Sequence, residues 1–402
     1  MSRLNIAFVT PLNPIPNGLS DYSELLLPAL AEHADITIYS ECGIPENQAI
    51  ADRFEVRPVR QLLRHHAQHD LRLYQIGNSA DHASAFEMLR CLPGIVVLHE
   101  PFLHTGYRYM STLRPYQREL LYELGALEPD AQAHWAAEAD RVVLQAAPLI
   151  RRLVDSSLGV IVHSQAARRL VVQTSSPRAH AVPIEVIPHL MGLPPRSEPR
   201  TARSEFGWPV DALLIGVPGT IDPTKEPALT LRAFAGVSRI QSDARLIFMG
   251  DRPLDYGLSD LVRELNLLGR VEFMGRVEPL AKLERALAAC DIIVNLRRPT
   301  IGETSGTALR ALALGRALVV RDSGWFGEIP AECSLKIGAT AEIEELTQVL
   351  LTLASQPELR QRLGDAARAH LQAECDVTQV AQRYAAFLQV IYAGYSGPSG
   401  SS

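Results

Sequence analysis

The sequence predicts an α/β protein made of two doubly wound domains in series, and two observations support this prediction. Short apolar runs alternate with longer helical patterns through both halves of the chain, which is typical of parallel sheets covered by helices. The chain also has 402 residues, whereas a single hydrophobic core rarely keeps growing beyond about 250 to 300 residues. We therefore expect each half to form a core of its own.

The N-terminal domain, expected over residues 1–190, begins with an apolar strand at Asn5–Thr10 that prolines and Gly18 bring to an end. A helix is expected from about Ser20, and Pro28 should kink it or end it early. Further strands are predicted at Asp35–Tyr39, Leu71–Ile76, Ile95–His99 and Val160–Val162, with helices at Ala83–Arg90 and within Pro115–Val154.

Residues 191–209 are rich in proline and charge and are predicted to be an interdomain linker. The C-terminal domain is expected over residues 210–376, a helix over 377–393 should pack back on the N-terminal domain, and 394–402 should be a flexible tail. The strands predicted in this half are Leu213–Val217, Arg245–Gly250, Val271–Met274, Ile292–Leu296, Ala317–Val320 and Leu335–Ile337. The helices predicted are Ala228–Ala235, Leu258–Asn266, Leu280–Ala289, Thr307–Leu314, Ile343–Ser355, Pro357–Glu374 and Thr378–Tyr392.

Composition excludes several classes of protein. A formal net charge of −6 removes the basic footprint of a protein that holds nucleic acid, so no nucleic-acid partner is expected. The five cysteines are scattered singly, which predicts buried thiols in a reducing compartment rather than a disulfide framework. The first residues run straight into a strand, and no stretch of about 18 apolar residues occurs, so a cytoplasmic protein is expected.

Ligands of doubly wound domains bind at the carboxyl ends of the strands, so polar residues there are candidate site residues. In the N-terminal half these are Asn17, Gly18 and Tyr22 after the first strand, His99 after a later one, and Asn78 with His82 after the strand between them. A glycine before a helix lets backbone N–H groups approach an anion, but a turn with a helix cap explains the same residues equally well. His99 is a functional residue or a structural one at about even odds.

In the C-terminal half, the loop from Gly219 through Thr220 to Lys225 follows a strand and precedes a helix, so the lysine can reach a phosphate there. A second loop, Arg297–Thr307, ends in small and hydroxyl residues at the start of a helix, which suits a diphosphate. Glu303 in that loop either contacts a sugar hydroxyl or caps the helix. Because the sequence has no Asp-x-Asp pair and no histidine cluster with metal spacing, we predict no metal and no cofactor.

These motifs together resemble the retaining family 4 glycosyltransferases, which have the GT-B fold of two Rossmann-like domains facing across a cleft. The resemblance covers Asn5 to Tyr392 and rests on five segments. They are Pro16–Tyr22, Pro93–Glu100, Val160–Ser164, Gly219–Lys225 and Arg298–Gly306 with its continuation to Gly315. The resemblance implies transfer of a sugar from a nucleoside diphosphate sugar to a hydroxyl of a glycan, lipid-linked or small-molecule acceptor, with retention of configuration.

The resemblance also implies roles for individual residues. His99 would lie beside the reacting centre, and Glu303 would contact the donor sugar. The residues implied for the donor diphosphate are Gly18, Gly219, Thr220, Lys225, Thr304, Ser305, Gly306 and Thr307. Those on the donor-sugar or acceptor side are Asn17, Tyr22, Asn78, His82 and Gly302. Those near the base or ribose are Gly250, Arg276, Val277 and Arg310.

The sequence departs from the family pattern at two positions. Thr220 stands where the family has an arginine, for which Arg276 or Arg298 would compensate, and Ala311 stands where it has a second glutamate, beside Arg310. These departures leave open a second interpretation, a degenerate glycosyltransferase homologue that binds its ligand but acts as a binding or partner subunit. The double α/β pattern leaves open a third, a sugar-nucleotide epimerase. A NAD-dependent dehydrogenase is disfavoured because no G-x-G-x-x-G follows either opening strand.

The basic stretch Arg57–His69 admits two interpretations. An amphipathic helix there would rest on anionic lipid, which gives peripheral contact with the inner membrane face, whereas a solvated helix face needs no partner.

Overall fold

The computed structural model describes residues 3–15, 17–110, 113–125, 147–174, 181–196 and 199–395. It divides the chain into two compact units. The N-terminal unit comprises Met1–Leu190, Ile301–Thr304 and Cys375–Ser402, and the C-terminal unit comprises Met191–Thr300 and Ser305–Glu374. Three predicted features, Pro16, most of the helical stretch within Pro115–Val154 and residues 396–402 of the tail, lie wholly or partly outside the described residues.

The N-terminal unit is built on a parallel sheet with the strand order β3-β2-β1-β4-β5-β6-β7. Its strands are β1 (Leu4–Val9), β2 (Ala34–Tyr39), β3 (Glu55–Arg57), β4 (Leu71–Ile76), β5 (Ile95–Leu98), β6 (Gly159–Val162) and β7 (Ile184–Val186). Parallel register, such as Ile6 opposite both Ile36 and Leu71, aligns the carboxyl ends of all these strands at one edge. That edge is where the polar loops of this unit begin.

Helices cover both faces of this sheet, since the strands alternate residues between two separate apolar clusters. The described helices are α1 (Gly18–Leu30), α2 (Gln48–Arg53), α3 (Leu62–His65), α4 (Ala83–Cys91), α5 (His104–Met110), α6 (Leu113–Leu124), α9 (Arg151–Asp155), α10 (Gln165–Thr174) and α18 (Val377–Tyr395). Short 3-10 turns lie at Val59–Gln61, His66–Gln68 and Ala80–His82.

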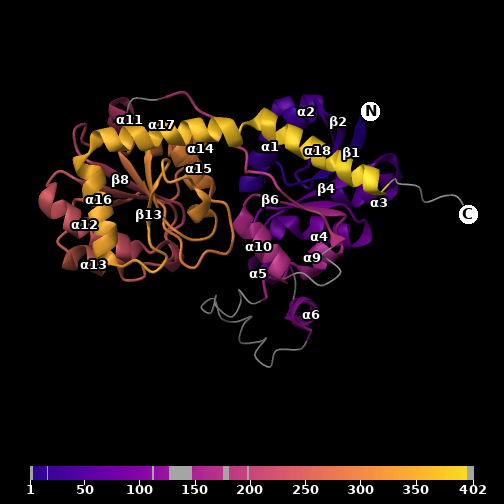
Figure 1. Cartoon of the computed structure of the whole chain (residues 1–402), viewed down its shortest axis with the longest axis horizontal. Helices are drawn as coiled ribbons and strands as arrows, with labels where there is room; N and C mark the ends of the chain where they lie inside the picture. The colour runs from indigo at the N-terminus through magenta and orange to yellow at the C-terminus, as the bar shows by residue number, and fades with distance from the viewer. Residues whose placement is uncertain are drawn as a thin grey trace, which may run out of the picture. The chain divides into compact units, whose positions relative to one another are not determined.

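Helix α18 brings the end of the described chain back to the N-terminal unit, where it lies beside α1 (Figure 1). Its residues Tyr384, Leu388 and Ile391 are buried in the same apolar cluster as Leu26 of α1. The cluster therefore joins residues that are more than 350 positions apart in the sequence.

The C-terminal unit repeats the topology, with a parallel sheet in the order β10-β9-β8-β11-β12-β13. Its strands are β8 (Leu214–Pro218), β9 (Arg245–Met249), β10 (Val271–Phe273), β11 (Ile292–Val294), β12 (Ala317–Arg321) and β13 (Leu335–Ile337). Its helices are α11 (Pro199–Phe206), α12 (Pro227–Ile240), α13 (Leu258–Glu264), α14 (Leu280–Ala289), α15 (Gly306–Ala313), α16 (Ile343–Ser355) and α17 (Pro357–Glu374). Two 3-10 turns lie at Pro223–Lys225 and Gly324–Glu328.

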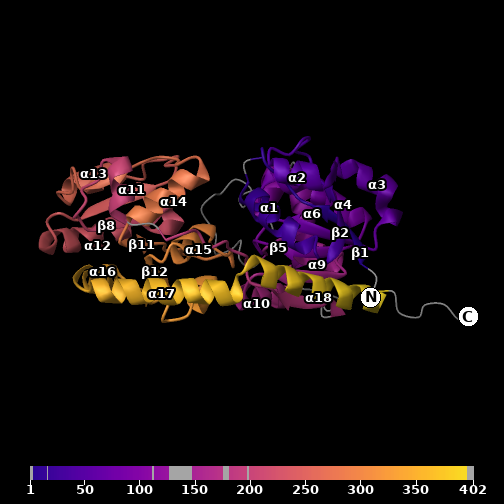
Figure 2. The ribbon, with the colours of Figure 1, turned by 90° about the horizontal axis from the view of Figure 1, so that it is seen from above.

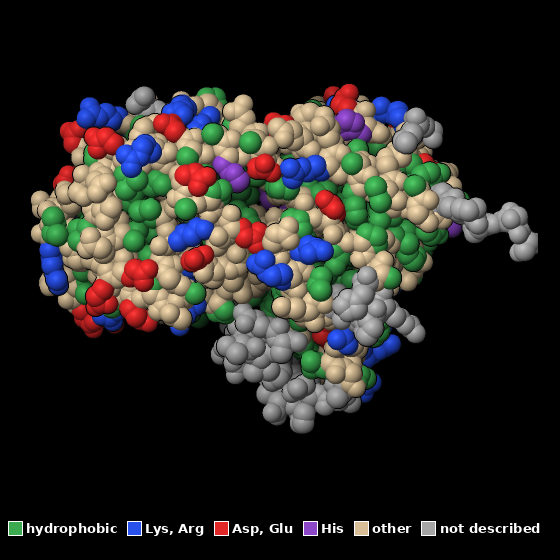
Figure 3. Space-filling model, in the orientation of Figure 1, with side chains coloured by type: hydrophobic (Ala, Val, Ile, Leu, Met, Phe, Trp, Pro, Cys, Tyr) green, Lys and Arg blue, Asp and Glu red, His purple; other side chains and the backbone are tan. Residues whose placement is uncertain are grey.

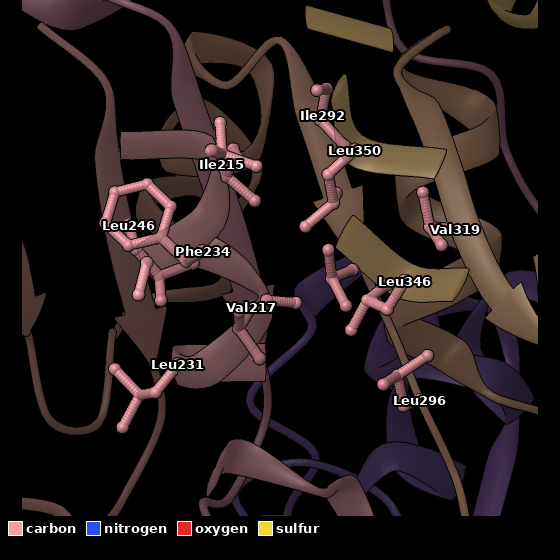
Figure 4. Packing of buried hydrophobic residues seen from close by; sticks show 14 of the residues in the cluster. Ile215, Val217, Leu231, Phe234, Leu246, Ile292, Leu296, Val319, Leu346 and Leu350 are labelled. Carbon is pink, nitrogen blue, oxygen red and sulfur yellow. The ribbon is translucent and has the colours of Figure 1, made fainter. Parts of the chain in front are cut away.

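The core of the C-terminal unit lies between this sheet and the helices α12 and α16. Figure 4 shows side chains of the strands, Ile215, Val217 and Ile292, in one layer with Phe234 of α12 and Leu346 of α16, and all five side chains are buried. On another side of the unit α11 packs on α14 (Figure 2), so part of the stretch predicted as linker is a helix. Burying Phe234 alone contributes about 2–3 kcal/mol.

Two parallel-sheet α/β domains were predicted and are confirmed, but some local predictions are wrong. Helix α1 continues through Pro28 to Leu30, because the fully buried Leu27 and Leu30 hold its last turn against the core. Residues Arg57–His69 do not form one amphipathic helix, since β3 ends at Arg57 and two 3-10 turns flank the four-residue α3.

The cysteines also differ from the prediction of buried thiols. Cys91 is exposed at the end of α4 and Cys42 is half-buried, whereas Cys290, Cys333 and Cys375 are buried. On the face shown in Figure 3, the Lys and Arg side chains of the described residues are interspersed with Asp and Glu side chains. That face has no broad basic area of the kind that holds a nucleic-acid backbone.

Candidate functional site

In each sheet the strand order reverses between two neighbouring strands, at β1/β4 in the N-terminal unit and at β8/β11 in the C-terminal unit. Open α/β sheets bind ligands outside the carboxyl ends of the strands at this switch point, because the two following loops diverge there. The loops that follow β8 and β11 are those beginning at Gly219 and Asn295. Both loops singled out in the C-terminal half of the sequence therefore lie at its switch point.

The loop after β8 turns sharply at Gly219, which has φ +91°. Its N–H donates to the Met249 carbonyl over 2.8 Å, which ties the loop to the end of β9. A Cβ at Gly250 would lie only 2.1 Å from the Gly219 carbonyl oxygen. Gly250 therefore shapes the loop through close backbone packing, and its contact with a nucleotide stays a prediction.

Lys225 ends the 3-10 turn that follows this loop, and Asp222 caps that turn by accepting from the Thr224 N–H over 2.8 Å. The Lys225 ammonium folds back over Gly219 and donates to the Pro218 carbonyl over 3.1 Å. A side chain at position 219 would collide with the Nζ atom, 1.8 Å from an ideal Cβ. The half-buried cation is thus held above the turn, where an anion bound by the loop would lie.

We expect Gly250→Ala to lower the free energy of unfolding by about 1–3 kcal/mol, because the new methyl group overlaps backbone that cannot move without opening the loop. Thermal unfolding monitored by circular dichroism measures this change. Gly192→Ala is the matched control, since a Cβ at Gly192 meets nothing within 4 Å. Equal melting temperatures for the two variants would contradict the proposed packing.

The loop after β11 leads into α15 through a set of hydroxyl contacts. Ser305 is the N-cap residue, and its Oγ accepts from the Ala308 N–H over 3.2 Å. Thr307 Oγ1 lies 3.2 Å from Ser305 Oγ and accepts from the Asn295 side chain over 2.8 Å. The amides of the first helical turn have no acceptor within a helix, so those of Gly306 and Thr307 are the groups suited to a phosphate.

Glu303 lies two residues before this cap and is 7% exposed. Its Oε2 accepts from the Ile301 N–H over 2.8 Å, so part of the carboxylate shapes its own loop. It does not cap α15, because Ser305 does so. Gly302, with φ +85°, makes the turn between these residues.

A basic residue that the sequence interpretation did not assign lies next to the lysine turn. Arg297 donates from Nη1 to Thr224 Oγ1 over 2.7 Å, and the Arg298 N–H donates to the Thr224 carbonyl over 2.7 Å. Thr220, which stands where the resemblance implies an arginine, is exposed. Of the two residues predicted to compensate, Arg298 is exposed and Arg276 pairs with Glu278 over 2.5 Å. The sequence signal for Arg297 as a candidate site residue was its position directly after a predicted strand.

The residues predicted near the nucleotide base or ribose differ in their surroundings. Arg276 is exposed, and the adjacent Val277 is half-buried. Arg310 donates to the Gly306 carbonyl over 3.1 Å and lies 3.7 Å from Glu284. Ala311, which stands where the resemblance implies a second glutamate, is fully buried and has no polar side-chain atom to offer a ribose.

In the N-terminal unit, Asn17 joins the loops of the switch point. It caps α1 by accepting from the Leu19 N–H over 3.0 Å, and its amide donates to Ser79 and Asp81 over 3.1 and 3.0 Å. It also lies 3.3 Å from Nε2 of the buried His82. The predicted Gly18 is the first residue of α1, and a Cβ there would meet nothing within 4 Å.

Asn78, predicted beside His82, accepts from the Gly106 N–H over 2.7 Å and so links the loop after β4 to α5. In the described structure it therefore has a local bonding role, and contact with a sugar or acceptor remains a prediction.

Three histidines form a cluster at the carboxyl edge of this sheet, each following a different strand. His99 follows β5, His163 follows β6 and His189 lies three residues after β7, with ring centroids 4.6 Å apart for the first pair and 5.2 Å for the second. His163 Nε2 lies 3.1 Å from His99 Nδ1, and His99 Nε2 lies 2.7 Å from Gln75 Oε1. Both nitrogens of the predicted catalytic ring therefore have protein partners.

Burial keeps His99 and His163 neutral. It lowers the pKa of His163 and of His82 to about 4. The pKa of His99 also lies well below its usual value, mainly through burial and then through the neighbouring His163 and His189. A neutral imidazole has one donor and one acceptor nitrogen, so each contact has a definite direction.

Tyr22 packs its edge against His99 with ring centroids 4.6 Å apart, and it is 2% exposed. Its hydroxyl lies 2.8 Å from that of Tyr384 on α18, and burial raises the pKa of both phenols. Tyr22 therefore positions His99 in the described structure, and direct contact with an acceptor stays a prediction.

Two parallel-sheet α/β units, each with polar loops at its switch point, are the components of the GT-B fold. Residues 199–370 match the sequence pattern of the family Glycosyl transferases group 1. The match includes both loops described above.

Two characterised relatives are similar to part of the chain. A GDP-mannose-dependent monoacylated alpha-(1-6)-phosphatidylinositol monomannoside mannosyltransferase from Corynebacterium glutamicum is 25% identical over 192 residues, which cover 46% of this chain and 50% of the relative. A D-inositol 3-phosphate glycosyltransferase from Stackebrandtia nassauensis is 33% identical over 136 residues, which cover 31% and 29%. The chain thus spans half or less of the length of these relatives.

Two solved structures share the fold over nearly the whole chain. The Anabaena protein HepE in complex with UDP-glucose gives a TM-score of 0.66 at 18% identity, covering 96% of this chain and 100% of that one. Sucrose-phosphate synthase from Thermosynechococcus elongatus also gives 0.66 at 18% identity, covering 98% and 100%. In the described residues, no helix is long and apolar enough to cross a membrane.

Proposed function

We propose that the protein is a glycosyltransferase that moves a hexosyl group from a nucleoside diphosphate sugar to a hydroxyl acceptor with retention of configuration. The single observation that supports this most is the pairing of two anion-binding loops at one switch point. Lys225 lies over the first loop, and the N-terminus of α15, capped by Ser305, follows the second. The family match of residues 199–370 supports the same proposal.

The proposed chemistry needs little from the protein beyond electrostatics and orientation. When the bond between the sugar and the diphosphate breaks, negative charge grows on the leaving oxygen, and Lys225 with the first amides of α15 would stabilise it. The buried Glu303 would hold a donor-sugar hydroxyl and stabilise positive charge at the anomeric carbon. We assign the acceptor to the N-terminal unit, around Asn17 and His99.

The acceptor is proposed by analogy with the named relatives. One acts on a phosphatidylinositol mannoside and the other on inositol phosphate, both of which present hydroxyl groups. We therefore propose a glycan, lipid-linked or small-molecule acceptor, and peripheral contact with the inner membrane face if the acceptor is a lipid. The enzyme would need no organic cofactor.

Transfer is expected to continue without divalent metal, since Lys225 and helix amides would meet the diphosphate charge in place of a cation. Initial rates should stay within about twofold when EDTA is added to enzyme that has been passed through a chelating resin. A metal-dependent transferase assayed with the same donor is the control. Loss of transfer that manganese or magnesium restores would contradict metal independence.

A second candidate, a homologue that binds nucleotide sugar without transferring it, is favoured by Thr220 and the buried Ala311 in place of two family side chains. A screen of nucleotide sugars by thermal shift identifies the donor, and a transfer assay then separates the candidates. Stabilisation by a donor with neither transfer nor donor hydrolysis would favour the binding protein.

A further inference from the structure

Gln75, a residue of β4 that is fully buried, contacts two of the histidines at the edge of the N-terminal sheet. Its backbone carbonyl lies 3.2 Å from Nδ1 of His82, and its side-chain Oε1 lies 2.7 Å from Nε2 of His99. Its amide Nε2 is buried and has no hydrogen-bond partner. A buried amide nitrogen without an acceptor costs about 1–3 kcal/mol, so this arrangement needs an explanation.

The hydrogen bonds of His163 determine which atoms donate and which accept in the contacts from His163 through His99 to Gln75. His163 Nδ1 lies 2.9 Å from the Ile187 carbonyl, which can only accept, so that nitrogen must be protonated. In a neutral ring the other nitrogen, Nε2, is then an acceptor, and it faces His99 Nδ1 at 3.1 Å. His99 must therefore donate from Nδ1, which leaves a lone pair on its own Nε2.

An acceptor nitrogen of His99 opposite the Gln75 carbonyl oxygen would be repulsive. The two ends of a glutamine amide have the same shape, so a half-turn of the group places its NH₂ against His99 without moving other atoms. This half-turn gives the amide nitrogen its missing acceptor and removes the repulsion. The opposite arrangement requires His99 to be an imidazolium, which the neighbours His163, His189 and Tyr22 disfavour because none of them supplies a negative charge.

We propose that Gln75 is a positioning residue that donates from its side-chain amide to Nε2 of His99 and so holds His99 as the neutral Nδ1–H tautomer. A substrate hydroxyl that replaces this amide meets a lone pair, so His99 accepts a hydrogen bond and does not donate a proton to the leaving group. The inference deepens the proposed function and depends on it only for its effect on turnover.

The titratable groups that face His99 come from each element around it. They are His163 and His189 from the loops after β6 and β7, His82 from the turn after β4, and Tyr22 from α1. His82 also has an amide at Nε2, that of Asn17, but its Nδ1 lies on the backbone carbonyl of residue 75 and not on the Gln75 side chain. It is therefore an internal control for changes to the Gln75 side chain.

The test is a long-range ¹H–¹⁵N spectrum of the full chain labelled with ¹⁵N-histidine, with the His99 signals assigned by a His99→Asn variant. At pH 7 the wild-type His99 should show a protonated Nδ1 and an unprotonated Nε2. In Gln75→Glu the carboxylate can only accept, so Nε2 should become protonated and the apparent pKa of His99 should rise, while the His82 signals stay unchanged. Turnover at pH 7 should fall at least tenfold and recover partly as the pH is raised.

A protonated Nε2 in the wild-type spectrum would overturn the proposal, and that spectrum decides the tautomer even if the variant does not fold. Unchanged His99 signals or unchanged turnover in a folded Gln75→Glu protein would overturn it as well. If the spectra agree with the proposal but the wild-type protein transfers no sugar, the proposed function fails and the assignment of the hydrogen bond stands.

Discussion

Glu303→Gln is expected to lower turnover by about 100-fold, an increase of about 2.7 kcal/mol in the activation barrier. The substitution keeps the size of the side chain and an oxygen that can accept from the Ile301 N–H, but it removes the negative charge. A neutral amide stabilises a donor-sugar hydroxyl and a developing positive charge much less than a carboxylate does. Steady-state kinetics with the identified donor measures the effect, and affinity for the free nucleoside diphosphate should barely change.

Glu303→Ala and Glu332→Gln complete this experiment. The alanine variant also loses the bond to Ile301, so it reports what the loop needs for its shape. Glu332 is an exposed carboxylate outside this loop, and its substitution should leave turnover unchanged. If Glu303 only shapes the loop, Glu303→Gln will keep near-normal turnover and Glu303→Ala alone will be impaired, which would remove Glu303 from the site.

Lys225→Ala should weaken binding of the nucleoside diphosphate by about 10- to 150-fold, which corresponds to the 1.5–3 kcal/mol of a hydrogen bond to a charged group. The ammonium is half-buried over Gly219 and bonds the Pro218 carbonyl, so its removal takes charge from the loop and leaves the capped turn in place. Isothermal titration calorimetry with the nucleoside diphosphate measures the loss, and the melting temperature without ligand should change little.

The control for this variant is Lys282→Ala, which removes an exposed lysine of α14 in the same unit. It keeps the change in net charge identical while leaving the loop after β8 intact. Equal affinities in Lys225→Ala and wild type would mean that the lysine does not contact the phosphates. A similar loss in both variants would mean that general charge, and not the position of Lys225, governs binding.

The sequence was sufficient to predict the architecture because the central strands are mostly apolar. Leu71–Ile76 and Leu280–Ala289 were predicted with the bounds that the structure has, since apolar periodicity defines both ends. Strands β3 and β7 were missed because each has only three residues, two of them charged in β3 and one in β7, which is too short for a period to be visible. Pairing with the neighbouring strand forms them, and that is not a local property.

The candidate site was predictable only in part. The loops at Gly219 and Arg298 were found because glycines and hydroxyl residues after a strand are a local signal. The partners of His99 were missed because Gln75 and His163 come near it only through the strand order. A signal was available for His163, which directly follows a strand just as His99 does. Gln75 lies inside β4, and nothing in the local sequence indicates that its side chain contacts His99.

The return of α18 to the N-terminal unit has a consequence for synthesis on the ribosome. Domains usually fold in the order in which they leave the ribosome, at about 5–20 residues per second. Here all of the C-terminal unit precedes Cys375, whereas Tyr22 and Leu26 of α1 are covered by residues of α18. The N-terminal unit, which is translated first, therefore lacks part of its core until α18 has been translated. Until then the apolar surface of α1 is exposed to chaperones and to other nascent chains.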